Sequence, residues 1–521
     1  MENFAVISPD SDVEPLPTDV PALHDMIRQL QRDKCKLIEQ CILFRHSRFG
    51  VSSEKAPGQG EMFNEAEVLA EEPAPEEVAV AAPPATEKPP ATRGGRKPLP
   101  AHIPRIEIIH DLPESEKVCA CGCQKRLIGE EVSEQIDIIP MQFRVLRHVR
   151  KTYACSCEAG APVTVALPPQ PIPKSNASPG LLAMLLTTKY VDGLPLYRFE
   201  KILTRGQVDI PRQTLARWVI QSSELLQPLF NLLRDQLVAH DVIHCDETVI
   251  QVLKEPDKSP TSQSYMWVQT GGPPGRPVVL FDYDPSRSGQ VPKRLLGDWQ
   301  GYLMTDGYEG YNAVVAQPGI THLCCWTHAR RKFNEARLVQ PKGKTGKADV
   351  ALALIGRLYG VEHDSKDAGI EARCQRRQES SLPLLDELRI WLDKSLHATP
   401  PKGKLGEALH YLDKYWPKLI RYVERGDLPI DNNRCENAIR PFVVGRKAWL
   451  FSDTPKGAHA SALIYSLVET AKANGHEPYA RLSHVLQELP GTTCLEDVEK
   501  LLPWKLDALK LISKVMTAPG A

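Results

Sequence analysis

Long apolar runs are missing from this chain of 521 residues. A membrane-spanning helix needs about 20 consecutive, mostly apolar residues, and no stretch of the sequence approaches that length. The opening residues, MENFAVISPDSDVEP, also lack the basic and apolar blocks of a secretory signal. We therefore predict a cytoplasmic protein that does not associate with a membrane.

Cysteine is too sparse for a disulfide scaffold, because the chain has only 13 cysteines and places five of them between Cys119 and Cys157. In a reducing compartment, such a cluster indicates metal ligation or unpaired thiols. Hydrophobic residues make up 42% of the chain and charged residues 25%, which is typical of globular proteins and excludes a fully disordered chain. At roughly 150 residues per domain, we expect about three domains.

An excess of one charge is also absent, because the formal net charge is −1. This average conceals separated charges: residues 51–90 carry −7, residues 141–240 carry +6 and residues 321–350 carry +5. A single basic cluster is often a solvated helix face, but basic segments set apart from an acidic one also fit a polyanion. Nucleic acid is therefore the first partner that we predict.

A heptad pattern marks the N-terminal segment, residues 1–55. Apolar residues recur every seven positions from Leu23 to Phe44, which predicts a zipper-like helix. So short a zipper is marginally stable alone, so it either dimerises or packs on the rest of the protein. Residues 56–104 are rich in Pro, Ala and Glu and predict a disordered linker.

The cysteine cluster lies in residues 105–166, where a segment with strand-like alternation separates two thiol-rich corners. Zinc prefers four thiolates in a tetrahedron, and two such corners supply them in a ribbon-like module. Both corners read C-x-C instead of the usual C-x₂-C, so a metal-free module with free thiols stays an alternative. The candidate zinc ligands are Cys119, Cys121, Cys123, Cys155 and Cys157.

Residues 167–237 predict a helical, helix-turn-helix-like domain. Two apolar stripes with helical spacing flank Gly206, which permits a tight turn. The second helix directs Arg212, Gln213 and Arg217 outward, and Arg and Gln are side chains that recognise guanine and adenine edges. Many enzymes contain helical hairpins without a role in DNA binding, so the pattern leaves both interpretations open.

Residues 238–480 change to short strands followed by helices. Three antiparallel strands and then alternating strands and helices predict a ribonuclease-H-like α/β core. A charged, leucine-patterned segment at about 342–427 predicts a helical insertion, and residues 481–521 predict a C-terminal helical tail. The fold class is thus multi-domain α+β. The predicted strands are Asp241–Leu253, Tyr265–Thr270, Pro277–Tyr283, Gly301–Met304 and Thr321–Trp326.

Three acidic residues occupy suggestive positions in this core. Asp246 lies in the first strand, Asp306 follows the fourth strand and Glu436 lies on a later helix. Phosphodiester chemistry uses two hard cations about 4 Å apart, held by carboxylate oxygens. Any one carboxylate is most often a cap or a surface charge, but three in these positions favour a metal site. Glu247 is the alternative to Asp246. Adjacent residues on a strand face opposite sides of a sheet, so only one of the two can belong to the metal site.

Eight segments, in order along nearly the whole chain, resemble the transposases of the insertion-sequence sixty-six family, which are bacterial DDE transposases. The segments are RFGVSSEK, RKPLPAHIPR with HDLPE, EEVSEQIDIIPMQFRVLRHVRKTYAC, LPLYR, HCDETVIQVL, TDGYEGYNAV, CCWTHARRKF and DNNRCENAIRPFVVGRKAWLFS. Each segment alone is weakly specific, whereas the ordered set is highly specific.

The resemblance implies that Asp246, Asp306 and Glu436 are the catalytic acids, with Asp246 preferred over Glu247. It implies a reaction with Mg²⁺ or Mn²⁺ in which water cleaves the ends of the mobile element and the new 3′ hydroxyls attack target DNA. It also implies a homo-oligomer, a nucleoid location and small accessory proteins encoded beside the transposase. Charge makes further residues candidate phosphate contacts: His328, Arg330, Arg331, Lys332, Arg440, Arg446 and Lys447.

The sequence leaves one competing function of a different class. A DNA-binding regulator derived from a transposase would keep the fold and lose strand transfer. The three intact acidic residues argue against this alternative.

Overall fold

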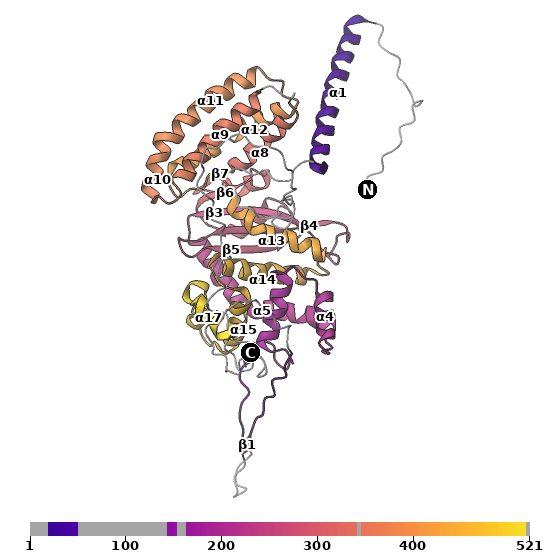
Figure 1. Cartoon of the computed structure of the whole chain (residues 1–521), viewed down its shortest axis with the longest axis vertical. Coiled ribbons are helices and arrows are strands. Elements are labelled where there is room, and N and C mark those ends of the chain that lie inside the picture. Colours follow the sequence, from indigo (N-terminus) through magenta and orange to yellow (C-terminus); the bar gives the residue numbers. More distant parts are fainter. Residues whose placement is uncertain (1–18, 50–142, 154–162, 341–344, 517–521) are drawn as a thin grey trace, which may run out of the picture. The chain divides into compact units, whose positions relative to one another are not determined.

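The computed structural model describes residues 19–49, 143–153, 163–340 and 345–516 (Figure 1). The predicted linker at 56–104 and all five cysteines of the predicted zinc module lie outside these ranges. No helix in the described ranges combines the length and the apolar character of a membrane span.

The N-terminal segment forms a single helix of 30 residues, α1 (Val20–Phe49), as the heptad pattern predicts. Its heptad leucines are mostly exposed, with 59% of Leu30 and 62% of Leu37 accessible to solvent. A second short feature is a pair of antiparallel strands, in which β1 (Thr152–Tyr153) pairs with β2 (Val163–Thr164).

Three helices precede the large sheet: α3 (Pro179–Tyr190), α4 (Leu196–Arg205) and α5 (Arg212–Val238). The side chain of Ser178 caps the start of α3 by accepting a hydrogen bond from the backbone N of Leu181. Helices α4 and α5 form the expected helix, turn and helix, but α5 continues to the start of the sheet and packs on the later helix α14. The second helix of the hairpin therefore also belongs to the packing of the core.

The large sheet is mixed and contains five strands: β3 (Val242–Gln251), β4 (Gln263–Gly271), β5 (Val278–Asp284), β6 (Gly301–Thr305) and β7 (Ile320–Cys324). Their order is β5-β4-β3-β6-β7; β3 to β5 are antiparallel, and β6 and β7 continue parallel to β3. Each predicted strand agrees with an observed one to within two residues at either end. The α+β class is confirmed, and the mixed sheet of five strands is consistent with the predicted ribonuclease-H-like core.

Helices connect the later strands of this sheet and continue the chain after its last strand. Small elements join the last three strands of the chain: α6 (Gln290–Leu296) lies between β5 and β6, and a 3₁₀ turn at Glu309–Tyr311 and α7 (Asn312–Val315) lie between β6 and β7. After β7 come α8 (Trp326–Leu338), α9 (Lys347–Asp364), α10 (Ile370–Arg376), a π-turn at Arg377–Ser381, α11 (Leu382–His397), α12 (Lys404–Leu419) and a 3₁₀ turn at Ile420–Glu424. Phe333, Leu354, Leu388 and Leu412 of α8, α9, α11 and α12 are buried in one common core, so these helices form a single packed layer.

The remaining helices are α13 (Asn433–Trp449), α14 (Pro455–Ala473), α15 (Pro478–Glu488), α16 (Leu495–Glu499) and α17 (Ala508–Met516). Helix α13 packs on β3 and β4, and α14 runs along β5 (Figure 1). The chain thus returns to the sheet only after the helical layer, and this return carries Glu436 to β3.

Helix α14 satisfies the open edge of the sheet. The hydroxyl of Thr470 accepts a hydrogen bond from the backbone N of Val279 at 3.0 Å and donates one to the carbonyl of the same residue at 2.9 Å. The hydroxyl of Ser466 accepts one from the backbone N of Phe281 at 2.7 Å. Unpaired edge groups promote pairing with other chains, so these side chains replace a missing strand.

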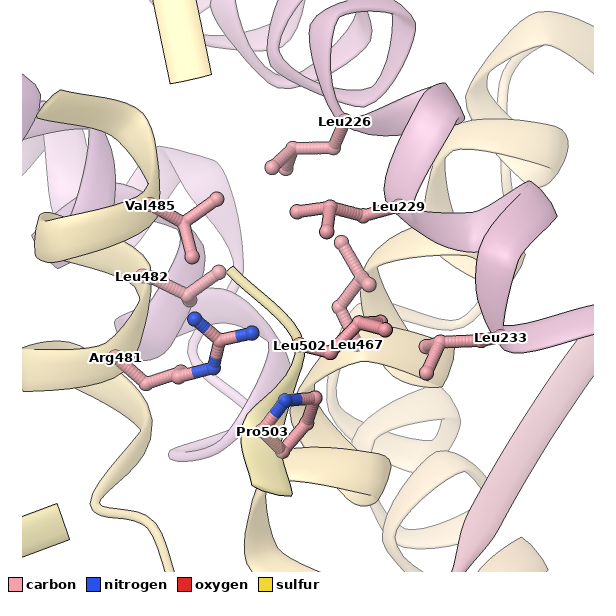
Figure 2. Close-up of a pocket in the computed structure, with 9 residues that line it drawn as sticks. All are labelled: Leu226, Leu229, Leu233, Leu467, Arg481, Leu482, Val485, Leu502 and Pro503. Carbon is pink, nitrogen blue, oxygen red and sulfur yellow. The ribbon is translucent and has the colours of Figure 1, made fainter. Parts of the chain in front are cut away.

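A small cavity lies between α5, α14 and α15 (Figure 2). Its volume is about 20 Å³ and leucine side chains form most of its wall. Arg481 extends into this wall, and burial lowers the pKa of its guanidinium to about 9. Its Nη2 donates to the carbonyl of Leu501, whereas Nη1 has no hydrogen-bond partner in the described part of the chain. The C-terminal helices therefore enclose a cation among apolar groups, which is costly to bury.

Replacement of Thr470 by valine tests the contact between α14 and β5. The change keeps the shape but leaves the N–H and C=O of Val279 buried without partners, so we expect the free energy of unfolding to fall by about 2–3 kcal/mol. Thr188→Val is the matched control, because the Thr188 hydroxyl is buried and already lacks a partner. Denaturant unfolding measures both; an equal response of the two variants would contradict the edge-capping role.

Candidate active site

Parallel pairing of two central strands brings Asp246 level with Asp306. His244 of β3 lies beside Met304 of β6, and the two aspartates are each two residues further along. The pKa of Asp246 is raised well above its ordinary value, first by burial and then by the negative charges of Glu247 and Asp306. Two acidic residues that are 60 positions apart therefore share one electrostatic environment.

Helix α13 brings the third acid to the same place. Glu436 lies in the first turn of α13, and its charge also raises the pKa of Asp246. Its Oε1 has no hydrogen-bond partner in the described part of the chain, although His328 Nδ1 lies 3.7 Å away. The structure thus gathers all three acidic residues that the sequence singles out.

Asn432, at the N-cap of α13, fixes the position of this helix. Its side-chain amide donates to the carbonyl of Cys245 at 3.0 Å, and its amide oxygen lies 3.0 Å from His244 Nδ1. Its backbone N donates to the sulfur of Cys325 at 3.2 Å. Asn432 is fully buried, and it joins α13 to β3 and to the end of β7. No pattern in the sequence singles out Asn432, since an asparagine before a helix normally indicates only a cap.

Glu247 is engaged in a separate set of contacts. Arg287 donates to its Oε1 through both Nε and Nη2, at 2.8 and 2.6 Å. The hydroxyl of Tyr311 donates to its Oε2 at 2.8 Å. Both carboxylate oxygens are therefore bound to protein groups, which favours Asp246 as the metal ligand.

The residues present fit a pair of hard divalent cations. Carboxylate oxygens are the ligands that Mg²⁺ and Mn²⁺ prefer. Neighbouring negative charges raise the pKa of the buried Asp246, and an added positive charge would relieve that repulsion. Asp246, Asp306 and Glu436 are the residues that would hold the ions.

The basic residues predicted to contact phosphate fall into two groups. His328 and Arg331 of α8 face Glu436, with Arg331 Nη2 at 3.8 Å from Glu436 Oε2. Arg330 and Lys332 lie on the same helix and are half-buried, and Lys447 is exposed on α13. The α8 group therefore lies on an element that borders the acidic cluster.

Arg446 has a structural use inside the fold. Its Nη1 donates to the hydroxyl of Thr248 at 3.3 Å and to the carbonyl of Val249. These contacts hold the C-terminal half of α13 against β3, and burial lowers the pKa of the Arg446 guanidinium. Arg440, six positions earlier on the helix, is half-buried.

The predicted DNA-reading side chains lie on the first turns of α5. Arg212, Gln213 and Arg217 are all exposed, and the opposite face of the helix is buried. The backbone N of Arg212 donates to the carboxylate of Glu200 on α4 at 2.8 Å, which fixes the angle between the two helices. A basic, solvent-facing helix start therefore lies at the turn of a helical hairpin, next to α4.

This mixed sheet with its many helices has the arrangement of the ribonuclease-H-like core that is typical of the class of DDE transposases. Residues 174–460, more than half of the chain, match the family described as Transposase IS66 family. The chain belongs to this family of transposases, which confirms the resemblance carried by the eight sequence segments.

Other parts of the chain match further families. Residues 116–158 match the zinc-finger binding domain of transposase IS66, and residues 36–108 match a family described as Transposase C of IS166 homeodomain. Residues 466–504 match the IS66 C-terminal element. The predicted cysteine module thus coincides with a zinc-finger region of known type.

Similar curated proteins come from Sinorhizobium fredii (strain NBRC 101917 / NGR234). Uncharacterized protein y4qI is 31% identical over 82% of this chain and 80% of its own length. Uncharacterized protein y4jD is 29% identical over 79% of this chain and 82% of its own length. Uncharacterized protein y4hP is 30% identical over 79% of this chain and 76% of its own length. The likeness therefore extends over most of each protein.

The raised pKa of Asp246 predicts that Asp246→Asn stabilises the metal-free protein. A carboxyl whose folded pKa is raised contributes stability below its unfolded pKa of about 3.9 and loses it as the pH rises. We therefore expect the variant to melt at a higher temperature than the native chain at pH about 8 in EDTA, with a smaller difference at pH about 5.

Mg²⁺ should reverse this order, because it stabilises the native chain and not the variant. Thermal unfolding with and without Mg²⁺ measures the effect, and the exposed Asp298→Asn is the control. If the melting temperature of the native chain changes with neither pH nor Mg²⁺, this result would contradict a buried acidic site.

Proposed function

We propose that this chain is a DNA transposase that binds the terminal inverted repeats of its insertion sequence and carries out metal-dependent strand cleavage and strand transfer. The observation that carries the proposal is the convergence of Asp246, Asp306 and Glu436 within a ribonuclease-H-like core. Membership of the transposase family supports it. The competing DNA-binding regulator would not need this costly cluster of like charges.

In this proposal, Asp246, Asp306 and Glu436 bind and orient the reacting phosphodiester through divalent ions. Bound Mg²⁺ would activate the attacking oxygen and stabilise the leaving oxygen. The α8 side chains Arg330, Arg331 and Lys332 neutralise backbone phosphates, with His328 beside them. The contacts of Asn432 keep Glu436 in position against β3 while DNA is bound.

DNA recognition in this proposal is divided between two regions. Arg212, Gln213 and Arg217 read base edges from α5, while Arg440 and Lys447 of α13 neutralise phosphates. The cysteine module binds Zn²⁺ and adds a further DNA contact. Because two element ends have to be joined in one reaction, the active species is an oligomer of this chain, with accessory proteins of the same element as candidate partners.

Strand transfer tests the catalytic proposal directly. Purified chain, Mg²⁺ and a labelled, pre-cleaved element end should give joined product, and Glu436→Gln should reduce its rate by about 100-fold or more, since it removes one charge from the metal ligands. Glu371→Gln, at an exposed site on α10, is the matched control and should leave the rate unchanged.

Product gels with candidate accessory proteins added complete this test. Absence of cleavage and joining under all these conditions, with DNA binding intact, would overturn the proposal in favour of the DNA-binding regulator. Cleavage without joining would instead identify a nuclease.

Substitutions on α5 test the DNA-reading proposal. Arg217→Ala should weaken binding to the terminal repeat by about 1–3 kcal/mol and change binding to unrelated DNA much less, because base contacts carry sequence specificity. Lys456→Ala, an exposed basic residue on α14, is the control. Fluorescence anisotropy at fixed salt measures both, and an equal loss for the two DNAs would show that Arg217 contacts only the backbone.

A further inference from the structure

A second set of metal-binding atoms lies beside the acidic cluster. The sulfur of Cys325, an imidazole nitrogen of His328 and a carboxylate oxygen of Glu436 all lie within 4.8 Å of one another. Cys325 directly precedes α8, His328 is in the first turn of α8 and Glu436 is in the first turn of α13. Two helix starts therefore converge on one point with three different ligand types.

Burial opposes a charged sulfur at Cys325, and two backbone N–H groups offset part of this effect. The residue is fully buried, and burial raises the pKa of its thiol to about 12. The backbone N of Asn432 donates to the sulfur at 3.2 Å, and the backbone N–H of His328 also acts to lower the thiol pKa. Backbone amides directed at a sulfur stabilise its negative charge, so the protein supplies part of what a thiolate needs.

The other two candidate ligand atoms, on His328 and Glu436, lack hydrogen-bond partners among the described residues. Both atoms, His328 Nδ1 and Glu436 Oε1, are buried. Their separation of 3.7 Å is too long for a hydrogen bond. Unpaired buried polar groups are costly, and a bound cation would satisfy both.

We propose that Cys325 Sγ, His328 Nδ1 and Glu436 Oε1 form a binding site for a thiophilic transition-metal ion, with Zn²⁺ as the best match. Zn²⁺ accepts sulfur, nitrogen and oxygen ligands at 2.0–2.3 Å, so small side-chain rotations suffice to bring the three atoms onto one ion. Mg²⁺ is excluded here because it does not bind thiolate. On binding, the Cys325 thiol releases one proton to solvent, and the fourth position stays open to water.

This site would regulate the chain through Glu436. The same carboxylate belongs to the acidic cluster, so a Zn²⁺ ion bound to its Oε1 competes with the hard cations for this ligand. Zn²⁺ at low concentration should therefore inhibit strand transfer in the presence of excess Mg²⁺. This consequence rests on the proposed function, whereas the binding site itself does not.

Cobalt titration of the full-length chain tests the site without an activity assay. Co²⁺ replaces Zn²⁺ and gives a strong thiolate-to-metal absorption band for each cysteine ligand. We expect Cys325→Ser to bind one Co²⁺ fewer per chain than the native protein, with a matching loss of absorption. Cys435→Ser, a buried cysteine on α13 outside the site, is the matched control and should keep the native stoichiometry.

Further arms separate this site from the other metal sites. Asp246→Asn should retain the thiolate-to-Co²⁺ absorption band, because Asp246 is not a ligand of the proposed site. The cysteine module contributes equally to the absorption of every variant. If Cys325→Ser fails to fold by circular dichroism, His328→Asn replaces it and should likewise lose one ion. Equal Co²⁺ stoichiometry in the native chain and in the folded ligand variant would overturn the proposal, whether or not the chain catalyses strand transfer.

Discussion

The position of the candidate active site depends on one buried asparagine. Asn432 bonds to β3 through its side chain and to Cys325 through its backbone, and it starts the helix that carries Glu436. The helical layer α9–α12 separates Glu436 from Asp306 by 130 positions in the chain. The apolar core of that layer continues into the sheet through Val242, Met304 and Leu323, so packing brings the chain back to the sheet. The three contacts of Asn432 then fix where α13 begins against β3.

The same region combines features that oppose stability. Burial and neighbouring charges raise the pKa of Asp246, while Glu436 Oε1 and His328 Nδ1 lack hydrogen-bond partners in the described ranges. Elsewhere in the core, some polar groups are paired, as in the hydroxyl contacts of Ser466 and Thr470 with the edge strand β5. Other buried polar atoms, such as Thr188 Oγ1 and Arg481 Nη1, lack partners among the described residues. What distinguishes this site is that an unpartnered carboxylate oxygen and an unpartnered imidazole nitrogen lie beside a cluster of like charges, which is the arrangement expected where cations bind.

Glu436 connects the two donor sets of this region. One set consists of hard carboxylate oxygens from β3, β6 and α13, and the other adds the sulfur of Cys325 and the nitrogen of His328. Hard and soft cations differ in ligand preference, so the two sets would bind different metal ions. Because Glu436 belongs to both sets, the two ions would compete for its carboxylate. Competition for that carboxylate requires no change of fold, because α8 and α13 already converge there.

The sequence by itself determined the features that depend on local patterns. Alternation of apolar residues located the five strands, heptads located α1, and the position of Asp306 directly after β6 followed from the end of a buried strand. Tertiary structure alone decided how Asn432 holds α13, why Glu247 is occupied by Arg287 and Tyr311, and why Arg446 faces β3. These contacts join residues from 40 to 198 positions apart. Periodicity reports which face of an element is buried but not which distant element covers it, so only packing could settle them.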